Sequence, residues 1–224
     1  MHPARFIVAS LVLPFITLFV LSGCETTKTP SHLLVKRGNH SFEYQNWADA
    51  AEKYKEVLSR EASNSEIQYR YGLCLIELGE YSKAQSALEI AQSLDPRNDA
   101  ITFALADAFY QKKDYSRMFT MLRNRASDNR DLATWLVMAA YAEKLDDYDT
   151  AMEALSNACA IEDGTDSTPY YRTAVLEGRL GRTSEAIRRL RQAYAISPDD
   201  ERITVMLVEY GEIPGPTLGL APGQ

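Results

Sequence analysis

The chain has 224 residues and carries 31 acidic against 24 basic side chains, which gives a net charge of −7 at pH 7. An acidic chain argues against nucleic-acid binding, because basic residues supply most of the affinity for phosphate backbones. It also gives no reason to expect general electrostatic adhesion to anionic lipid headgroups.

The start of the chain has the pattern of a signal peptide, which we place at residues 1–23. Arg5 supplies a positive charge, residues 6–20 are apolar, and Leu21-Ser22-Gly23-Cys24 follows. The apolar run is shorter than the about 20 residues of a membrane span, but an uncleaved anchor stays open because residues 6–23 are uncharged. Cleavage would remove Arg5 and no acid, leaving 23 basic and 31 acidic residues and a net charge of −8.

The four residues that end at Cys24 resemble the lipobox of bacterial lipoproteins. The resemblance implies cleavage before Cys24 and acyl chains on this residue, which would hold residues 24–30 as a short tether at a membrane. An ordinary cysteine beside a general signal-peptidase site is the alternative. Glu25, rather than aspartate, follows the cysteine. In lipoproteins of enterobacteria-like species, this pattern implies the periplasmic face of the outer membrane.

A period of about 34 residues runs through the rest of the chain. One column of mostly small residues falls in the middle of each predicted helical hairpin: Ala50, Ala84, Met118, Ala151 and Ala186. The spacings are 34, 34, 33 and 35. Small residues let two antiparallel helices approach, and large residues fill the space that remains.

The units match the pattern with different quality. In the second unit, Gly72 lies in the first helix, Gly79 in the turn, and Pro96 ends the second helix. The third unit fits least, because Met118 replaces the alanine and Arg125 lies where an alanine face is usual.

These features resemble the tetratricopeptide repeat (TPR) over residues 31–200. The resemblance implies an all-α, right-handed α-solenoid of about five hairpins, at residues 31–64, 65–98, 99–131, 132–165 and 166–200. We expect residues 201–210 to form a capping helix, because terminal repeats must cover the apolar end of the stack. Residues 211–224 are rich in glycine and proline and are expected to be a flexible tail.

No catalytic or metal-binding pattern is recognisable. His32 and His40 have no cysteine or paired acid at ligand spacing, and no phosphate loop, nucleophile elbow or zinc motif occurs. Cys74 and Cys159 fall in different repeats, so we expect them to be buried and unbridged. The sequence therefore predicts no enzyme, no catalytic residue, no cofactor and no metal.

In the TPR family, the first helix of each unit commonly projects side chains into a concave groove. The resemblance therefore implies a partner-binding groove of aromatic, apolar and a few polar residues: Val35, Asn39, Phe42, Tyr69, Leu73, Ile76, Phe103, Asp107, Tyr110, Leu136, Glu143 and Tyr171. The alternatives are that the register is shifted by one residue or that these rings pack within the stack. Asn39 matches one position of the family's two-carboxylate clamp, but Val35 stands where the clamp has lysine, so this binding mode is not expected.

The lipobox and the repeats together predict a membrane-tethered scaffold for other envelope proteins or peptides, which would dock through apolar anchors. The architecture resembles the TPR lipoproteins of pilus assembly and those that organise peptidoglycan enzymes, and its residues do not select between them. Two alternatives remain: an enzyme or ligand-binding transport component that uses Asp107 and Glu143, and an unanchored secreted protein. Five arginines between Arg179 and Arg191 are a second candidate surface, for an acidic partner.

Overall fold

The structure is a computed structural model, and it describes residues 29–221. The predicted signal peptide and Cys24 lie outside the described residues. Within this range the chain forms eleven helices: α1 (Ser31–Glu43), α2 (Trp47–Leu58), α3 (Ser65–Glu77), α4 (Tyr81–Leu94), α5 (Asp99–Gln111), α6 (Tyr115–Asn129), α7 (Leu132–Lys144), α8 (Tyr148–Ile161), α9 (Thr168–Arg179), α10 (Thr183–Ile196) and α11 (Glu201–Glu209). None of these eleven helices has the length and apolar character that crossing a membrane requires.

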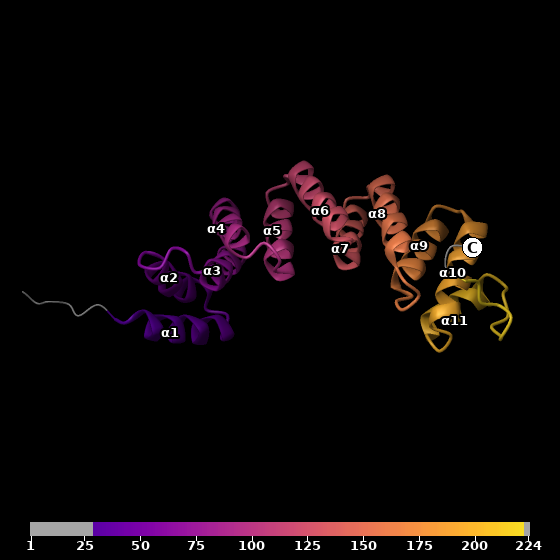
Figure 1. Cartoon of the computed structure of the whole chain (residues 1–224), viewed down its shortest axis with the longest axis horizontal. Coiled ribbons are helices and arrows are strands. Elements are labelled where there is room, and N and C mark those ends of the chain that lie inside the picture. The colour runs from indigo at the N-terminus through magenta and orange to yellow at the C-terminus, as the bar shows by residue number, and fades with distance from the viewer. Residues whose placement is uncertain (1–28, 222–224) are drawn as a thin grey trace, which may run out of the picture.

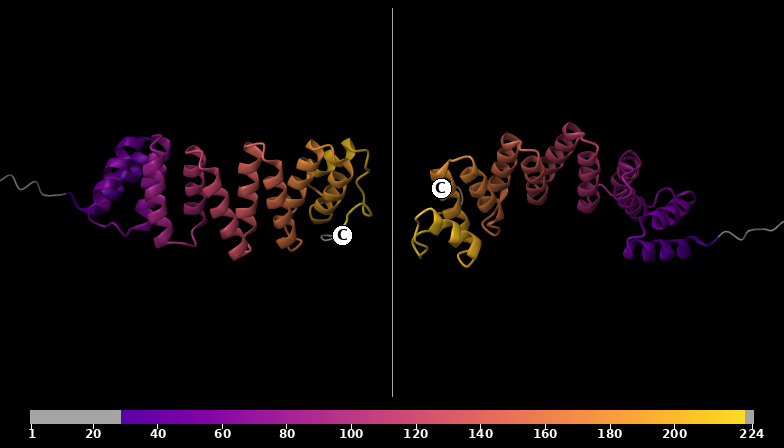
Figure 2. Two further views of the ribbon diagram at one scale, coloured as in Figure 1. Left: turned by 90° about the horizontal axis from the view of Figure 1, so that it is seen from above. Right: turned by 180° about the vertical axis from the view of Figure 1, so that it is seen from behind.

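Consecutive helices pack in pairs, from α1 with α2 to α9 with α10, and the second helix of each pair packs on the first helix of the next. The stack curves so that both of its ends lie toward the same side, with α4, α6 and α8 outside the curve (Figure 1). Seen from above, the helices stand side by side in one row (Figure 2). We call the side on which α3, α5 and α7 lie the inner face. The expectation of an all-α stack of helical hairpins is confirmed.

Three columns of residues, each with the period of the repeat, form the centre of every hairpin. The column found in the sequence is fully buried in all five units: Ala50, Ala84, Met118, Ala151 and Ala186. A column of large residues is also fully buried: Tyr54, Leu88, Leu122, Leu155 and Leu190. Opposite it the first helices carry small buried residues: Gly38, Gly72, Ala106, Ala139 and Ala174. Each hairpin is therefore held by the same large-into-small packing.

A residue in the left-handed conformation lies at the turn of every hairpin: Gln45, Gly79, Lys113, Asp146 and Gly181. In each turn the next amide bonds to a carbonyl five residues earlier, as when Glu80 N donates to Leu75 O at 2.8 Å. This bond satisfies a carbonyl at the end of the first helix. Glycine adopts the conformation freely, so the three other side chains carry a conformational cost.

The third hairpin differs from the others, as its sequence suggests. Helices α5 and α6 pack less closely than the other pairs, because the larger Met118 occupies the alanine column. Arg125 replaces the small apolar residue of the last turn, and its Nη1 donates to Pro96 O at 2.6 Å. Its Nη2 donates to Arg97 O at 3.1 Å and also pairs with Asp99. Hydrogen bonds to the α4–α5 loop therefore take the place of apolar packing at the end of α6.

The C-terminal end is capped by α11, which buries Ile203 and Leu207 completely. The tail, whose composition predicts flexibility, contacts α10. Leu220 N donates to Arg191 O at 3.0 Å, and Arg191 Nε donates to Leu218 O at 2.8 Å. Gly219 approaches so closely that a Cβ atom there would lie 3.2 Å from Ala195 Cα. These contacts join residues 218–220 to α10, and the flexibility of the tail stays a prediction.

Candidate functional site

The twelve residues expected to line the groove all lie on the first helices of the hairpins, namely α1, α3, α5, α7 and α9. All twelve are half-buried. Each therefore contacts its neighbours and keeps part of its surface exposed. The hydrogen bonds, salt bridges and ring contacts of this set fall into three groups, one at each end of the stack and one in the middle.

At the N-terminal end, two of these residues are engaged within the first hairpin. Asn39 Oδ1 accepts a hydrogen bond from the Tyr54 hydroxyl at 2.8 Å. Phe42 packs edge-on against Trp47, with ring centroids 5.1 Å apart. From the next hairpin, the Arg70 guanidinium lies 5.7 Å from the Phe42 ring centroid. Asn39 thus holds the hairpin together, and only the ring of Phe42 remains as contact area.

In the middle, rings from successive first helices meet. The centroids of Tyr110 on α5 and Tyr141 on α7 are 5.2 Å apart. Lys144 Nζ lies 5.1 Å from the Tyr141 centroid and 5.7 Å from that of Tyr110. Burial, together with the negative charge of Asp107, raises the pKa of Tyr141 to about 12. An acid, two rings and an ammonium group thus share one region between α5 and α7.

Sequence reasoning missed Tyr141. Its column holds Cys74 and Ala108 in the two preceding units, and both are fully buried, so the register assigns this position to the core. The available signal was the size of the residue, because a tyrosine is too large for a space that elsewhere takes cysteine or alanine. Tyr141 is half-buried instead.

Toward the C-terminal end, a salt bridge joins the fourth and fifth hairpins. Arg172 Nη2 donates to Glu143 Oε1 at 2.6 Å, and Arg172 Nη1 donates to Leu136 O at 2.7 Å. The Arg202 guanidinium of α11 lies 5.1 Å from the Tyr171 ring centroid. Glu143 is therefore already neutralised by an internal cation. Arg172 occupies the same position in its repeat as Arg70 does in the second repeat. The recurrence of arginine at this position could have marked Arg172 as a residue of the inner face.

The arginine-rich surface of the fifth hairpin is largely used internally. Arg182 Nη1 lies 3.3 Å from Glu177 Oε2, and Arg189 Nη1 donates to Gln192 Oε1 at 3.0 Å. Arg191 holds the tail, as described above. These arginines stabilise the end of the stack, which leaves little support for an acidic partner there.

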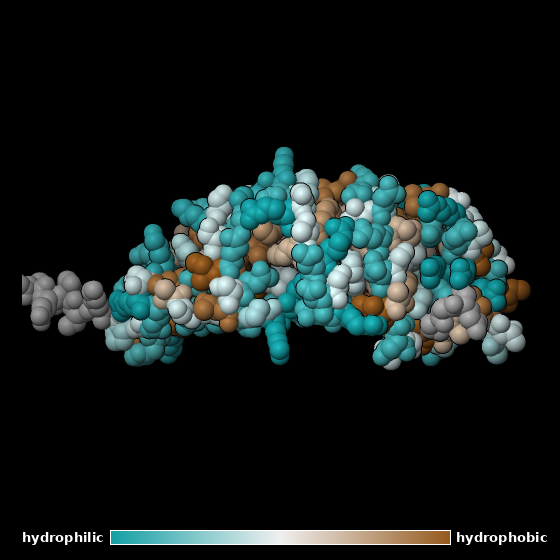
Figure 3. Space-filling view, turned by 45° about the horizontal axis from the view of Figure 1, so that its top comes forward, coloured by the Kyte–Doolittle hydropathy of each residue, from teal (hydrophilic) through white to brown (hydrophobic). Residues whose placement is uncertain are grey.

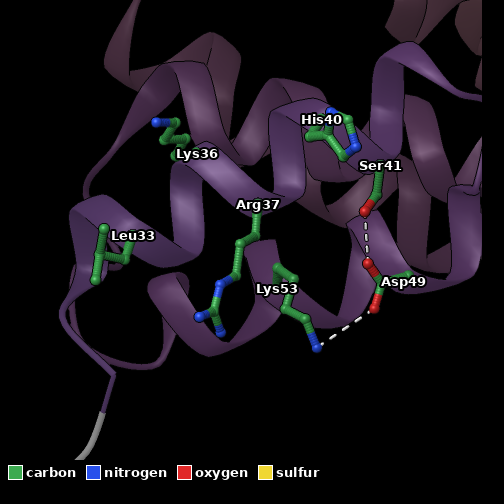
Figure 4. Close-up of a pocket in the computed structure, with 7 residues that line it drawn as sticks. All are labelled: Leu33, Lys36, Arg37, His40, Ser41, Asp49 and Lys53. Carbon is green, nitrogen blue, oxygen red and sulfur yellow. Dashed lines mark hydrogen bonds and ion pairs between the residues drawn. The ribbon is translucent and has the colours of Figure 1, made fainter.

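A pocket of about 440 Å³ lies between α1 and α2, at the N-terminal end of the stack (Figure 4). Its lining is mostly basic and polar: Leu33, Lys36, Arg37, His40, Ser41, Asp49 and Lys53. Asp49 is the acid of this lining and is paired, since Ser41 Oγ donates to its Oδ2 at 2.5 Å and Lys53 Nζ lies 3.4 Å from its Oδ1.

The repeat explains this pocket. The residues one repeat after Leu33 and His40 are Ile67 and Cys74 on α3. Both are buried against the first hairpin. Arg37 corresponds in the same way to Leu105 two periods later, which is also buried. The pocket is thus the surface that later units use to pack on the preceding hairpin, and polar residues replace apolar ones where no hairpin covers it.

The upper side of the stack, seen in Figure 3, is mostly hydrophilic, and its apolar residues lie in separate patches. Exposed large apolar side chains on second helices include Ile90 and Leu94 on α4 and Tyr148 on α8. Single residues of this kind are normal on protein surfaces. Among the described residues, no group of three or more histidine, cysteine, aspartate or glutamate side chains could hold a metal ion.

Comparisons with known proteins agree with this architecture. Residues 41–97 match the sequence profile of the Tetratricopeptide repeat family. No curated protein matches the chain.

Several solved structures share the fold. MamA from Desulfovibrio magneticus RS-1 is 14% identical over 76% of this chain and 97% of its own, with a TM-score of 0.56. YrrB, described as a TPR protein with an unusual peptide-binding site, is 15% identical over 79% of this chain and 91% of its own, with a TM-score of 0.52. A TPR repeats protein from Bacteroides fragilis is 17% identical over 82% of this chain and 98% of its own, with a TM-score of 0.50. Residues 41–97 therefore resemble the tetratricopeptide repeat in sequence, and most of the described chain shares the fold of these solved structures.

Proposed function

We propose that this protein is a membrane-tethered scaffold whose inner face binds a segment of another protein of the bacterial envelope. The observation that carries the proposal is the row of half-buried aromatic and apolar side chains on five successive first helices. Partly exposed rings provide rigid contact area for a partner. An extended or helical segment with apolar anchors fits such a row. The peptide-binding site named for YrrB, which shares the fold, supports the same mode of use.

The tether is the second part of the proposal. Arg60 Nη1 donates to Thr29 O at 2.6 Å, which fixes the start of the described chain against the end of α2. A lipid on Cys24 would then lie at most about 20 Å from this point, because an extended chain spans about 3.3–3.6 Å per residue. The first hairpin would stay close to the membrane, at the periplasmic face of the outer membrane by the residue that follows Cys24. Pilus assembly and cell-wall machinery are the two settings that the resemblance offers.

Substitution of Cys24 tests the tether. We expect the wild-type protein to incorporate labelled palmitate and to sediment with membranes, and Cys24→Ser to lose both properties. Cys74→Ser is the matched control, since it removes a cysteine that is buried in the fold. A wild-type protein that takes up no label and is released into the periplasm would show that the anchor is wrong and would favour the secreted alternative.

The alternative of a small cationic ligand or an enzyme finds less support. Of the two acids that it requires, Glu143 is paired with Arg172 at 2.6 Å. Asp107 alone is left of the pair of acids that this alternative requires. No further observation favours the alternative that the protein is an enzyme.

Crosslinking in intact cells tests the inner face. We expect the triple variant Tyr69→Ala, Phe103→Ala, Tyr171→Ala to remain helical by circular dichroism and to lose its main crosslinked partner. The matched control places three alanines on second helices: Ile90→Ala, Leu94→Ala and Tyr148→Ala. If both triple variants keep the same partners as the wild type, the inner face is not the binding surface.

A further inference from the structure

In the middle of the inner face, a positive charge already lies against two aromatic rings. Tyr110 and Tyr141 come from successive first helices, and their centroids are 5.2 Å apart. The ammonium group of Lys144 lies within 5.7 Å of both centroids. The electron-rich faces of aromatic rings attract cations at such distances. The ring pair is thus a cation site that the chain fills with its own lysine.

A carboxylate lies beside this ring pair. Asp107 is on α5, three residues before Tyr110, so the two side chains lie on one side of the helix. Its charge acts on the Tyr141 hydroxyl, where it helps to raise the pKa. Asp107 Oδ1 accepts a hydrogen bond from Gln111 Nε2 at 3.4 Å, which is long.

Asp107 differs in one respect from the other acid of the row. Glu143 has an arginine at 2.6 Å, whereas no salt bridge of Asp107 is found within residues 29–221. A half-buried carboxylate gains from a cation that it does not yet have. The site therefore combines two features that recognise a positive charge, the ring pair and an uncompensated acid.

We propose that Asp107, Tyr110 and Tyr141 form a subsite for a lysine or arginine side chain of the bound segment, and that Lys144 occupies the rings in the free protein. The inference rests on the proposed scaffold function and names the chemistry of the partner. A cation at this place would lie over the rings and neutralise Asp107. The acidic charge of the whole chain, −7, would also steer a basic segment toward it.

Lys144 is suited to being displaced. Its side chain is exposed and makes two ring contacts but no salt bridge within the described part of the chain. A long, flexible ammonium side chain can move into water at small cost. Removing Lys144 should therefore strengthen the binding of an external cation, while removing Asp107 should weaken it. The two substitutions lie in the same region and are expected to change the affinity for a cation in opposite directions. A general loss of structure would not produce this result.

The first test uses side-chain analogues on the whole protein. The probes are n-butylammonium and n-butylguanidinium, with n-butanol as the neutral control, and binding is followed by the NMR signals of the tyrosine rings. We expect both cations to shift the signals of Tyr110 and Tyr141, and n-butanol to leave them in place. Asp107→Asn should weaken binding about tenfold, as loss of one charged partner does.

Matched variants make the test specific. Lys144→Gln should strengthen binding several-fold, and Asp149→Asn, which removes an exposed acid from the second helix α8, should leave it within about twofold of wild type. Tyr141→Phe should keep binding, and Tyr141→Leu should lose it, because only the first keeps a ring. Equal shifts with n-butanol, or a Lys144→Gln variant that binds no better than wild type, would overturn the subsite.

Selection from a displayed library of random twelve-residue peptides separates this inference from the scaffold function. We expect wild-type protein to select apolar peptides with lysine or arginine at one position, and Asp107→Asn to select apolar peptides without that preference. If the wild-type protein selects apolar peptides with no basic position, the subsite proposal is wrong and the proposed scaffold function is unaffected. Failure to select any peptide would count against the scaffold, while the butylammonium titration would still decide the subsite.

Discussion

A Cβ atom on Gly72 would lie 2.6 Å from Cγ of Leu88, on the facing helix of the same hairpin. Real Cβ atoms do not approach other carbon atoms so closely, so the absence of a side chain at residue 72 sets the spacing of α3 and α4. Alanine occupies the same column in the third, fourth and fifth units, where the two helices accommodate it.

Gly72→Ala should therefore destabilise the protein by about 1–3 kcal/mol, the usual cost of overpacking a core. Urea unfolding followed by circular dichroism measures this. The control is the same substitution in a Leu88→Ala background, where the space opposite is empty. We expect the loss from Gly72→Ala to shrink there; an equal loss in both backgrounds would show that the contact with Leu88 is not the cause.

Lys113→Gly should stabilise the protein by about 0.5–1 kcal/mol. Lys113 has φ 60°, a left-handed conformation that is costly for a residue with a Cβ atom and free for glycine. The midpoint of thermal unfolding should rise accordingly. Gly79→Ala, in the equivalent turn at φ 74°, is the converse control and should lower stability by a similar amount. Asp146→Gly should gain less, because Asp146 Oδ1 also accepts a hydrogen bond from the Tyr148 hydroxyl at 2.9 Å.

The free energy of unfolding should fall as the pH rises from about 9 toward 12. Burial raises the pKa of Cys74 from 9.0 to about 12, and it raises those of Tyr54 and Tyr141 from 10.0 to about 12. The folded state then holds protons that the unfolded state has already released, so stability is complete below pH 9 and is lost through this window.

Urea unfolding at pH 8, 9, 10 and 11 measures the effect. Tyr54→Phe should show a shallower decline because one of the three groups no longer titrates, although it also loses the bond to Asn39 at all pH values. A free energy of unfolding that stays constant from pH 8 to 11 would contradict the burial of these groups.

Arg125→Ala should destabilise the protein by about 1–3 kcal/mol and increase amide hydrogen exchange in α6. The change leaves the carbonyls of Pro96 and Arg97 without the donors that join α6 to the α4–α5 loop. Arg123→Ala is the matched control on the same helix. Its partner Glu153 is an exposed acid, and an exposed salt bridge contributes only about 0–1 kcal/mol. Equal effects of the two substitutions would show that Arg125 has no special role.

The hairpins and their order were predictable because their packing repeats in the sequence. The column from Ala50 to Ala186 is buried in every unit, and five occurrences at one period make such a pattern visible without coordinates. The irregular third unit was visible for the same reason, since Met118 and Arg125 break two columns. The lipid on Cys24 remains a prediction of the sequence, outside the described residues.

The candidate site was predictable only as a set of positions. The sequence places the residues of the site on first helices, but it does not show which of them already bind other side chains of the protein. Asn39 accepts a hydrogen bond from Tyr54, and Glu143 accepts one from Arg172. Tyr141 was missed because its column elsewhere is core. The composition of the tail did not reveal the two hydrogen bonds that join it to Arg191.

By itself, the sequence determined the fold class and the large-into-small core, because these depend on spacing along single helices and on their turns. Only the tertiary structure decided which side chains meet between hairpins. Those meetings depend on the rotation of each hairpin against the next, which a period of 34 residues does not encode. The region of Asp107, Tyr110, Tyr141 and Lys144 is a product of that rotation, since its four side chains come from the first helices of two successive units.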